Sequence, residues 1–553
     1  MPQADRIITN AKVLTMEPDA PRAEAVAMAG ERILAVGSTA EIEALAGPGT
    51  DRIDAQGGTV LPGFIESHLH LFIGGAELMN LQLDNLADPD RMRDLIRDFA
   101  AAHPDRPLIT CQAPDYGVFG DRAPKALLDE ILPDRPLALV GHDHHTVWAN
   151  TAALDAAGVL YGRETAPGHE VVMGEDGLAT GALYEPEAYA PVLALGGQAR
   201  MMEGLNTGGE PDPAPTAAER EEDLAHMKRG LDHVARHGIT SIVNMDGNLY
   251  TLELLDELRR RGELNVRVRV PFHFVPDMDE SELSRAEEMT ARWNDEWLAS
   301  GFVKFFMDGV IDSRTAFVHN DYPGQPGFRS TGRFEAERFA ALATKIDAMG
   351  LQIAVHSIGD AATTRVLDGF EAARRANGDS GIRHRIEHLE LVAPGDFARL
   401  GPLGITASIQ PPHAPGCAGL PLEPTLTNIG RDRWEDAFAW QRLADNGAHI
   451  ALASDWPVSP VSILLGLESA TTRAAWTDGV PDQRFTLEAA LRGYTIGGAY
   501  AEHTEAIKGS LAPGKLADIV ILDGDIEATA PTALSEMGIR MTICGGRTSY
   551  SAT

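Results

Sequence analysis

Eight short apolar runs, separated by segments of helical character, constrain the fold of this chain more than any other feature of its sequence. Each run has the length of a buried strand, and strands that alternate with helices are typical of a parallel sheet. Eight such units predict an α/β protein built on a (β/α)8 TIM barrel, with functional residues at the carboxyl ends of the strands. The runs are residues 60–66, 240–245, 266–274, 302–307, 352–356, 384–388, 405–410 and 449–454.

The interval between the first two runs is too long for one helix and two loops. We therefore expect an α+β insertion over residues 75–222 that covers the active site, with the barrel formed by 61–74 and 223–508. Short β-type runs also lie near both termini, and neither set could bury a face alone. Residues 1–60 and 509–553 are predicted to form one small composite β-sandwich.

Charge and cysteine content narrow the range of partners. The 553 residues include 81 Asp and Glu against 47 Lys and Arg, a net charge of −34. This acidity disfavours nucleic acid and anionic membranes as partners, and no apolar stretch reaches the ~20 residues of a membrane span. Three scattered cysteines suit a reducing compartment, and the amino terminus shows no signal-peptide pattern. We expect a cytoplasmic protein.

The strongest chemical signal is the pair His68 and His70, which follows an apolar segment. In an extended chain, side chains at i and i+2 leave on the same side, so the two imidazoles converge. Simple packing is the alternative explanation, but it accounts poorly for two adjacent imidazoles. Because neutral imidazole is the commonest metal ligand, the pair predicts a metal site.

Further candidate ligands lie at the ends of other predicted strands. His356 ends the fifth run, His388 ends the sixth, and Asp455 follows the eighth. Lys304 lies in an aromatic stretch of the fourth run, where burial would lower its pKa and free a reactive amine. Reaction of that amine with carbon dioxide would give a carbamate able to bridge two metal ions.

Each of these residues also has a purely structural interpretation. A lone His356 or His388 is more often a hydrogen-bonded core histidine. Asp455 could cap a helix, and Lys304 could pair with Asp308. Their common position, at strand ends of one barrel, favours a single site over these separate explanations.

The motifs around these residues resemble the amidohydrolase superfamily and, in detail, its family 3, the YtcJ-like and N-substituted formamide deformylase group. The resemblance covers nearly the whole chain, including the insertion and the tail at 509–523. It rests on the motifs Leu-Pro-Gly-Phe-Ile-Glu-Ser-His-Leu-His (61–70), Val-Lys-Phe-Phe-Met-Asp-Gly (303–309), Val-His-Ser-Ile-Gly-Asp-Ala-Ala (355–362), Arg-Ile-Glu-His (385–388) and Ala-Ser-Asp-Trp-Pro-Val (453–458).

The resemblance implies two divalent metal ions. Zinc is the expected metal, and manganese, iron, nickel and cobalt are alternatives. A hydroxide between the ions would attack a carbonyl carbon, and Asp455 would act as the catalytic residue that carries its proton to the leaving nitrogen. The implied ligands are His68, His70 and Asp455 for the first ion, His356 and His388 for the second, and carboxylated Lys304 as the bridge.

Substrate-binding residues are expected on the loops after these strands and in the insertion. His145 aligns with the histidine of the family's Asp-Gly-His…Trp-Val-Asn motif, although His144 stands where the family has glycine. The candidates are Tyr116, His145, Asp308, His413 and Trp456.

The predicted function is metal-dependent hydrolysis of a non-peptide C–N bond, in an amide, formamide or cyclic amide. Ester or lactone hydrolysis and metal-dependent decarboxylation are alternatives, because the same ligands would serve them. A nucleobase aminohydrolase is disfavoured, since Gly359 stands where those enzymes place a catalytic glutamate. An inactive relative is disfavoured because no ligand is missing. The resemblance also suggests a homodimer.

Overall fold

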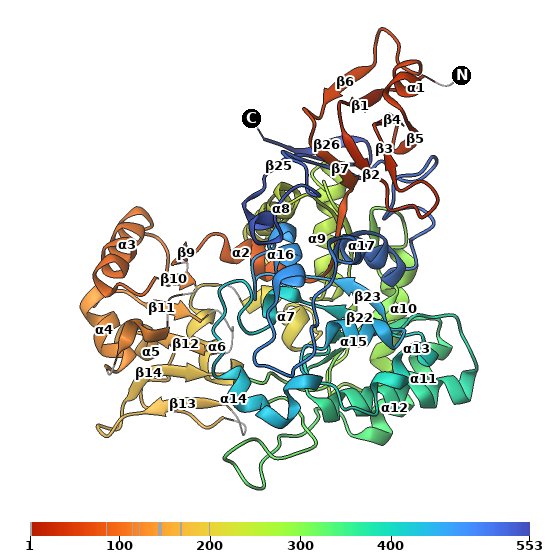
Figure 1. The fold of residues 1–553 in the computed structure, drawn as a ribbon. Helices are drawn as coiled ribbons and strands as arrows, with labels where there is room; N and C mark the ends of the chain where they lie inside the picture. Colours follow the sequence, from red (N-terminus) through yellow and green to blue (C-terminus); the bar gives the residue numbers. More distant parts are fainter. Residues whose placement is uncertain are drawn as a thin grey trace. The chain divides into compact units, whose positions relative to one another are not determined.

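A computed structural model describes residues 3–83, 86–112, 114, 116–120, 122–141, 146–165, 169–197 and 199–552 (Figure 1). The chain divides into two compact units. Unit 1 consists of Met1–Leu71, Thr207–Glu210 and Leu231–Thr553, and unit 2 consists of Phe72–Asn206 and Pro211–Gly230. In the part of the chain that the model describes, no helix has the length and apolar character needed to cross a membrane.

All eight predicted strands have counterparts in unit 1. They are β8 (Phe64–Leu69), β15 (Ile239–Asn244), a third strand split into β16 (Arg267–Arg269) and β17 (Phe272–His273), β19 (Phe302–Phe306), β20 (Gln352–Ser357), β21 (Arg385–His388), β22 (Thr406–Ile409) and β23 (His449–Leu452). Parallel ladders connect β8 to β15 and β16, and connect β17 through β19, β20, β21 and β22 to β23. After β23, the backbone N–H of Asp455 donates to the carbonyl of His68 at 2.9 Å, so this loop returns to β8. The strand order is that of a TIM-barrel-like α/β fold.

Helices follow most of these strands in the sequence. In α12, Ala362, Val366, Phe370 and Ala373 recur at helical spacing and are buried. Gly369 on this helix faces Phe339, and an added Cβ would crowd that ring, so glycine allows a close helix pair. The helices of unit 1 outside the terminal segments are α9 (Leu249–Arg260), α10 (Leu283–Arg292), α11 (Ala336–Ala348), α12 (Asp360–Asn377), α13 (Phe397–Leu403), α14 (Thr425–Ile429), α15 (Trp440–Asp445), α16 (Ile463–Thr472), α17 (Leu487–Arg492) and α18 (Gly498–Ala501).

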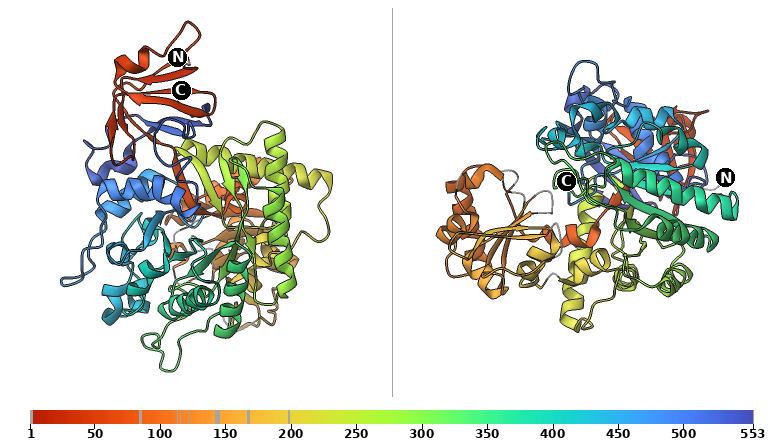
Figure 2. Two further views of the ribbon diagram at one scale, coloured as in Figure 1. Left: turned by 90° about the vertical axis from the view of Figure 1, so that its right-hand side faces the viewer. Right: turned by 90° about the horizontal axis from the view of Figure 1, so that it is seen from below.

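The terminal segments form two further sheets of unit 1, the first from amino-terminal strands alone and the second from strands of both termini. One has the order β5-β4-β1-β6, and the other has the order β26-β25-β24-β7-β2-β3. Buried side chains from both sheets form one core, as in a β-sandwich. Figure 2 shows the red amino-terminal strands beside the blue carboxyl-terminal ones. The strands are β1 (Arg6–Thr9), β2 (Lys12–Leu14), β3 (Arg22–Ala23), β4 (Ala25–Ala29), β5 (Arg32–Gly37), β6 (Asp51–Asp54), β7 (Thr59–Pro62), β24 (Ile519–Leu522), β25 (Ile539–Cys544) and β26 (Arg547–Ser551).

The predicted first barrel strand, 60–66, is wrong in its bounds. Residues up to Pro62 form β7, which pairs with β24 in the terminal sheet, and the barrel strand β8 begins only at Phe64. The break falls at Gly63, where an added Cβ would clash with Thr240. The shift extends β8 as far as Leu69, so His68 lies within the strand and His70 lies directly after it.

A buried ion pair joins the terminal segments to the barrel strands. Arg267 of β16 contacts Asp518 through two hydrogen bonds, Nε to Oδ2 at 2.8 Å and Nη2 to Oδ1 at 3.1 Å. Burial alone lowers the pKa of Arg267, but Asp518 outweighs it and raises that pKa. Such a bidentate pair fixes geometry as well as charge.

Unit 2 contains a mixed sheet of order β13-β14-β12-β11-β10-β9. Its strands are β9 (Leu81–Gln82), β10 (Ile109–Gln112), β11 (Leu137–Val140), β12 (Thr146–Ala149), β13 (Glu170–Met173) and β14 (Ala179–Tyr184). Its helices include α2 (Leu71–Glu77), α3 (Pro89–Ala102), α4 (Pro124–Ile131), α5 (Thr151–Ala156), α6 (Pro186–Ala194) and α7 (Ala199–Asn206), and α8 (Ala217–Arg236) begins in this unit.

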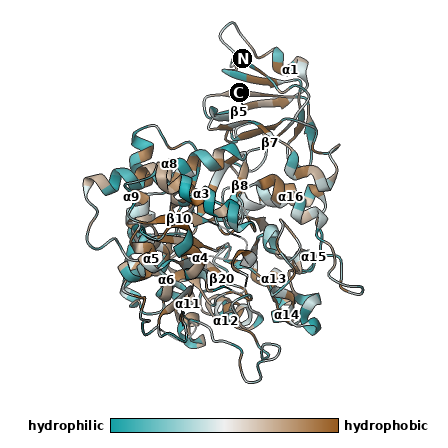
Figure 3. Ribbon diagram, turned by 90° about the vertical axis from the view of Figure 1, so that its left-hand side faces the viewer, coloured by the Kyte–Doolittle hydropathy of each residue, from teal (hydrophilic) through white to brown (hydrophobic). Residues whose placement is uncertain are grey.

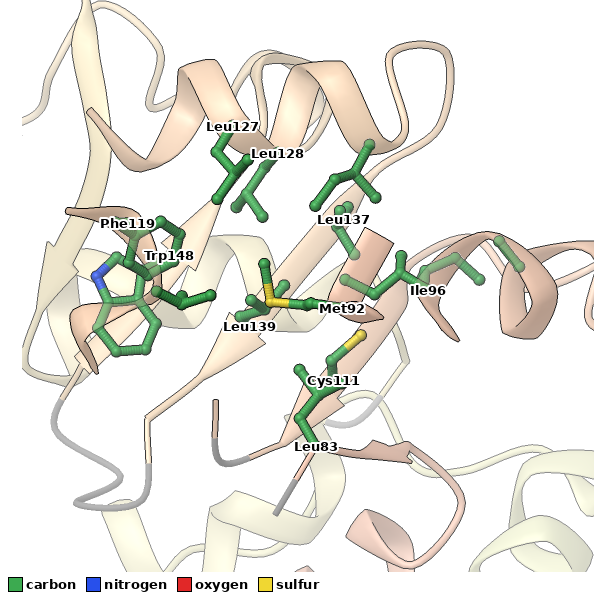
Figure 4. Close-up of a cluster of buried hydrophobic side chains, with 14 of the residues drawn as sticks. Leu83, Met92, Ile96, Cys111, Phe119, Leu127, Leu128, Leu137, Leu139 and Trp148 are labelled. Carbon is green, nitrogen blue, oxygen red and sulfur yellow. The ribbon is translucent and has the colours of Figure 1, made fainter. Parts of the chain in front are cut away.

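One face of this sheet is covered by α3 and α4. Met92 and Ile96 of α3 and Leu128 of α4 pack against Leu137 and Leu139 of β11 (Figure 4). In Figure 3, the hydrophobic strand β10 is brown, whereas α3 includes teal, hydrophilic turns. This mixture is expected of a helix that buries only one face in a core. Unit 2 therefore has a hydrophobic core of its own.

Candidate metal centre

His68 is held in a fixed orientation by a buried carboxylate. Its Nδ1 lies 2.8 Å from Oε2 of Glu387, and both side chains are fully buried. Burial opposes ionisation of Glu387, but Arg385 and His68 hold the pKa of this carboxyl well below its usual range. An ionised carboxylate can only accept, so Nδ1 of His68 carries the proton. The other nitrogen, Nε2, lies 3.3 Å from Oδ1 of Asp455.

His70 repeats this arrangement with different partners. Its Nδ1 forms a short hydrogen bond with Asp246, and its Nε2 lies 3.1 Å from Oδ1 of Asp455. Burial lowers the pKa of His70, but the two carboxylates outweigh it and raise that pKa to about 10. The carboxylates of Asp246 and Asp455 therefore stabilise positive charge at this position.

His356 and His388 are neutral imidazoles on neighbouring strands. Burial holds the pKa of each well below its usual value, and Lys304 adds to this effect at His356. Their ring centroids lie 4.4 Å apart, and the ring of His388 lies 5.0 Å from that of His68. Nε2 of His356 lies 3.1 Å from the carbonyl of Gly309, which can only accept, so its Nδ1 keeps a free lone pair.

Lys304 is buried, and its amine makes no hydrogen bond to any residue that the structure describes. Its side chain has no exposed surface. The nearest ring, that of Phe306, has its centroid 4.7 Å from Nζ. Burial lowers the pKa of Lys304 to about 8, although Glu387 and Asp455 oppose the shift. The amine is therefore far easier to deprotonate than an ordinary lysine.

The backbone is strained at two of the candidate ligands. His388 has φ of 75°, the next residue Leu389 has φ of 50°, and Asp455 has φ of 62°. These left-handed conformations are uncommon outside glycine and persist only where the surroundings impose them. Strain at two separate strand ends that meet at one point is typical of a functional site.

A cation fits the centre of this cluster. Ligand atoms of His68, His388 and Asp455 all lie within 4.8 Å of one another. Nδ1 of His388 is buried and lacks a hydrogen-bond partner among the described residues. The potential metal ligands are imidazole nitrogens and a carboxylate. Nδ1 of His68 and Nδ1 of His70 are hydrogen-bonded to carboxylates, those of Glu387 and Asp246. Ligands supported in this way are typical of a metal site.

Glu66 ties together the two strand ends that carry His68 and Asp455. Its Oε1 accepts from the backbone N–H of His68 at 3.3 Å and from that of Ser454 at 2.9 Å. Burial raises the pKa of Glu66 to about 8, so at neutral pH it is mostly protonated. It can therefore join the strands without adding a full charge to the site.

Three of the predicted substrate-binding residues lie near this cluster with distinct environments. The carboxylate of Asp308 accepts from the backbone N–H groups of Phe317, Ile358 and Gly359 at 2.8–3.1 Å, so it orders two loops. The ring of His413 stacks on His388 at 6.0 Å. The carbonyl of Trp456 accepts from the backbone N–H of His70 at 2.7 Å, so Trp456 lies beside the segment that carries the candidate ligand His70.

The other two predicted substrate-binding residues belong to unit 2. His145 lies outside the described residues. Tyr116 begins the short 3-10 helix η1 (Tyr116–Phe119), and its contact with substrate stays a prediction.

Sequence reasoning missed the carboxylates that support the histidines. Glu387 stands inside the quoted Arg-Ile-Glu-His motif, and Asp246 lies two residues after the end of strand β15. Position after a strand is the signal that could have identified Asp246. Glu390 was also missed: its carboxylate lies 3.6 Å from Nδ1 of His413.

Substitution of Asp246 by asparagine tests this supporting shell. An amide in place of the carboxylate can no longer fix the protonated Nδ1 of His70 by charge, so we expect metal affinity to fall by about 10–100-fold. Competition with a chromophoric chelator measures the change. The exposed Asp379→Asn provides a matched control, and equal affinity in the two variants would contradict the role assigned to Asp246.

The model of a family described as the amidohydrolase family, Amidohydro_3, matches residues 51–550. Protein LONG AFTER FAR-RED 3 of Arabidopsis thaliana is 30% identical over 94% of this chain and 87% of its own length. The N-substituted formamide deformylase of Arthrobacter pascens is 28% identical over 99% of both chains.

A solved structure has the same fold. An uncharacterized metal-dependent hydrolase from Pyrococcus horikoshii OT3 superimposes with a TM-score of 0.72, at 22% identity, over 96% of this chain and 99% of that one. At this identity the similarity concerns the fold alone, and it supports the TIM-barrel-like arrangement of the strands.

Proposed function

This chain belongs to the amidohydrolase family, and from that premise we propose that it is a metal-dependent hydrolase of a non-peptide C–N bond in a small molecule. The family match confirms the resemblance predicted from the motifs. The observation that carries the proposal is the convergence of His68 and His70 on Asp455, together with the amine of Lys304, which has no hydrogen-bond partner among the residues that the structure describes. We further propose that the eight strands close into one (β/α)8 barrel, with the terminal sandwich and the insertion as separate domains.

Two divalent ions, with zinc as the favoured metal, fit the donor set. When bound, such ions supply Lewis-acid polarisation of a carbonyl and lower the pKa of water. We assign His68, His70 and Asp455 to the first ion, His356 and His388 to the second, and Lys304 to both.

Lys304 would bridge the ions only as a carbamate. Its neutral amine adds to the carbon of carbon dioxide. A C–N bond forms as one C–O π bond breaks, and one proton passes from the nitrogen to solvent water. The product carries two oxygens and one negative charge in place of a potential ammonium. The lowered pKa of Lys304 supports this step, because at pH 8 about half of such amines are already uncharged.

Asp455 is the proposed proton carrier. It lies between the two histidines on one side, and its Oδ2 lies 4.0 Å from Nδ1 of His388 on the other. A carboxylate in this position can accept the proton of the attacking water and deliver it to the leaving nitrogen. Protonation of the nitrogen is what allows an amine to depart.

N-substituted formamides are the first substrates to test, because a relative of nearly equal length carries that activity in its name. Metal-loaded protein should release formate and an amine from an N-alkyl formamide, and lactams, larger amides and esters complete the screen. Removal of metal by dipicolinate should abolish turnover, and added zinc should restore it. Absence of bound metal after supplementation, or turnover of esters alone, would overturn the C–N assignment.

Asp308, His413 and Trp456 remain proposed contacts for the substrate, together with Tyr116 and His145. A cytoplasmic location and a homodimeric state likewise stay predictions.

A further inference from the structure

Unit 2 contains a cavity of about 420 Å³ that belongs to none of the groups described above. It is lined from several elements, among them the segment after α2, the end of α3, β10 and α8. This volume lies within the range of small-molecule sites, about 300–1,000 Å³. Leu108 and Met201 provide a buried apolar wall.

Two buried polar groups in the lining lack partners. Asn80 is 5% exposed and His226 is 9% exposed. Nδ2 of Asn80 and Nδ1 of His226 have no hydrogen-bond partner among the described residues. Oδ1 of Asn80 is occupied, since it accepts from Nη1 of Arg106 at 3.4 Å, which leaves its amide nitrogen as a free donor. A buried donor without an acceptor is costly, so both atoms point to something that fills the cavity.

Positive charge gathers at the same place. Arg106 lines the cavity, with Nη2 donating to the carbonyl of Met79 at 2.8 Å. Burial lowers the pKa of Arg106, and the nearby guanidinium of Arg229 lowers it further. Nη1 of Arg229 is itself buried and unpartnered in the part of the chain that the model describes. Both arginines are half-buried, and two guanidiniums that repel each other favour an anion nearby.

The acidic residues of the lining offset this charge only in part, because Glu222 opposes the lowering of the pKa of Arg106 without reversing it. Asp105 is exposed, and Oε2 of Glu222 lies 3.8 Å from Nη2 of Arg200 and so shares its charge with a third guanidinium. Burial and Arg229 lower the pKa of His226 to about 4, so at neutral pH its imidazole is uncharged and can donate to an acceptor.

We propose that this cavity binds a small organic carboxylate, whose oxygens face Arg106 and the amide of Asn80 while its apolar chain lies against Leu108 and Met201. Arg229 does not line the cavity, and its charge would attract the carboxylate from beside Arg106. The two oxygens of a carboxylate match the fork of a guanidinium. The apolar wall favours an alkyl or aryl carboxylate over a free inorganic anion.

The packing of two helices keeps the cavity in shape. Gly75 of α2 faces the backbone of α8, and an added Cβ would clash with the carbonyl of His226. The absence of a side chain at Gly75 lets the two helices approach closely, which sets His226 at the cavity wall.

Calorimetric titration of the metal-loaded protein with hexanoate tests the proposal. We expect saturable binding that weakens by at least about tenfold in Arg229→Gln and in Asn80→Leu, because the first removes a positive charge that attracts the carboxylate and the second removes a donor to it. Arg236→Gln, on the same helix but exposed, should bind as the unaltered protein does. Hexanamide and inorganic phosphate serve as the neutral and inorganic probes.

The position of the ligand separates this site from the metal centre. A crystal soaked with 6-bromohexanoate should show anomalous bromine density in the cavity of unit 2. Anomalous bromine density at the metal centre alone would overturn the proposal but would leave the hydrolase assignment unaffected. Hexanamide or phosphate binding as tightly as hexanoate, affinity unchanged in Arg229→Gln, or the absence of binding would overturn it as well.

Discussion

Asp455→Asn is expected to lower kcat by about 10²–10⁴-fold while most of the metal stays bound. Asparagine has the size of aspartate and keeps an oxygen at the position that lies 3.1–3.3 Å from the two histidines. It cannot accept a proton, so the transfer from water to the leaving nitrogen is lost. Steady-state kinetics on the substrate found in the screen measures kcat, and elemental analysis measures the metal.

The exposed Asp478→Asn is the matched control for this change, since it alters the same functional group far from the strand ends. Full metal content together with unreduced kcat would exclude proton transfer by Asp455. Loss of metal in Asp455→Asn would instead show that its charge is needed as a ligand, and the kinetic comparison would then carry no information about the proton.

Lys304→Met is expected to remove at least one of two bound metal ions and to lower turnover by more than about 100-fold. Methionine fills the same buried aromatic pocket without an amine, so packing is largely kept. Protein supplied with ¹³C-bicarbonate should give a carbamate carbon signal in NMR, and the variant should lack it. The signal gives a readout that does not depend on activity.

Lys508→Met controls for burial of a lysine. Lys508 is also buried, but its Nζ has two hydrogen-bond partners, Glu502 at 2.8 Å and Ser241 at 2.6 Å. The carbamate signal should therefore persist in Lys508→Met. A signal that survives in Lys304→Met, or full metal content in that variant, would contradict the bridging role.

The sequence was informative where chemistry follows from strand geometry. His68 and His70 are two residues apart, and period-two alternation brings them together whatever the rest of the fold does. His356 and His388 could be placed because parallel neighbouring strands end at one edge, and the ladder pairs Ser357 with His388. The TIM-barrel-like fold follows from the same regularity.

The sequence was uninformative where a role depends on a distant neighbour. Glu387 supports His68 across 319 positions, and no local pattern carries that pairing. The border between β7 and β8 was missed for another reason: both sides of Gly63 are apolar, so hydrophobic pattern alone reads them as one strand. Only the packing of Gly63 against Thr240 reveals the break.

The interleaving of β24 between β25 and β7 has a consequence for biosynthesis. On the ribosome, β7 emerges early and must wait for nearly the entire polypeptide before its permanent neighbour arrives. Until then its edge offers unsatisfied amides and carbonyls to any passing strand. Nascent chains that stall before β24 are therefore expected to bind chaperones. A carboxyl-terminal fusion that keeps β24 near the ribosome for longer should lower the yield of soluble protein.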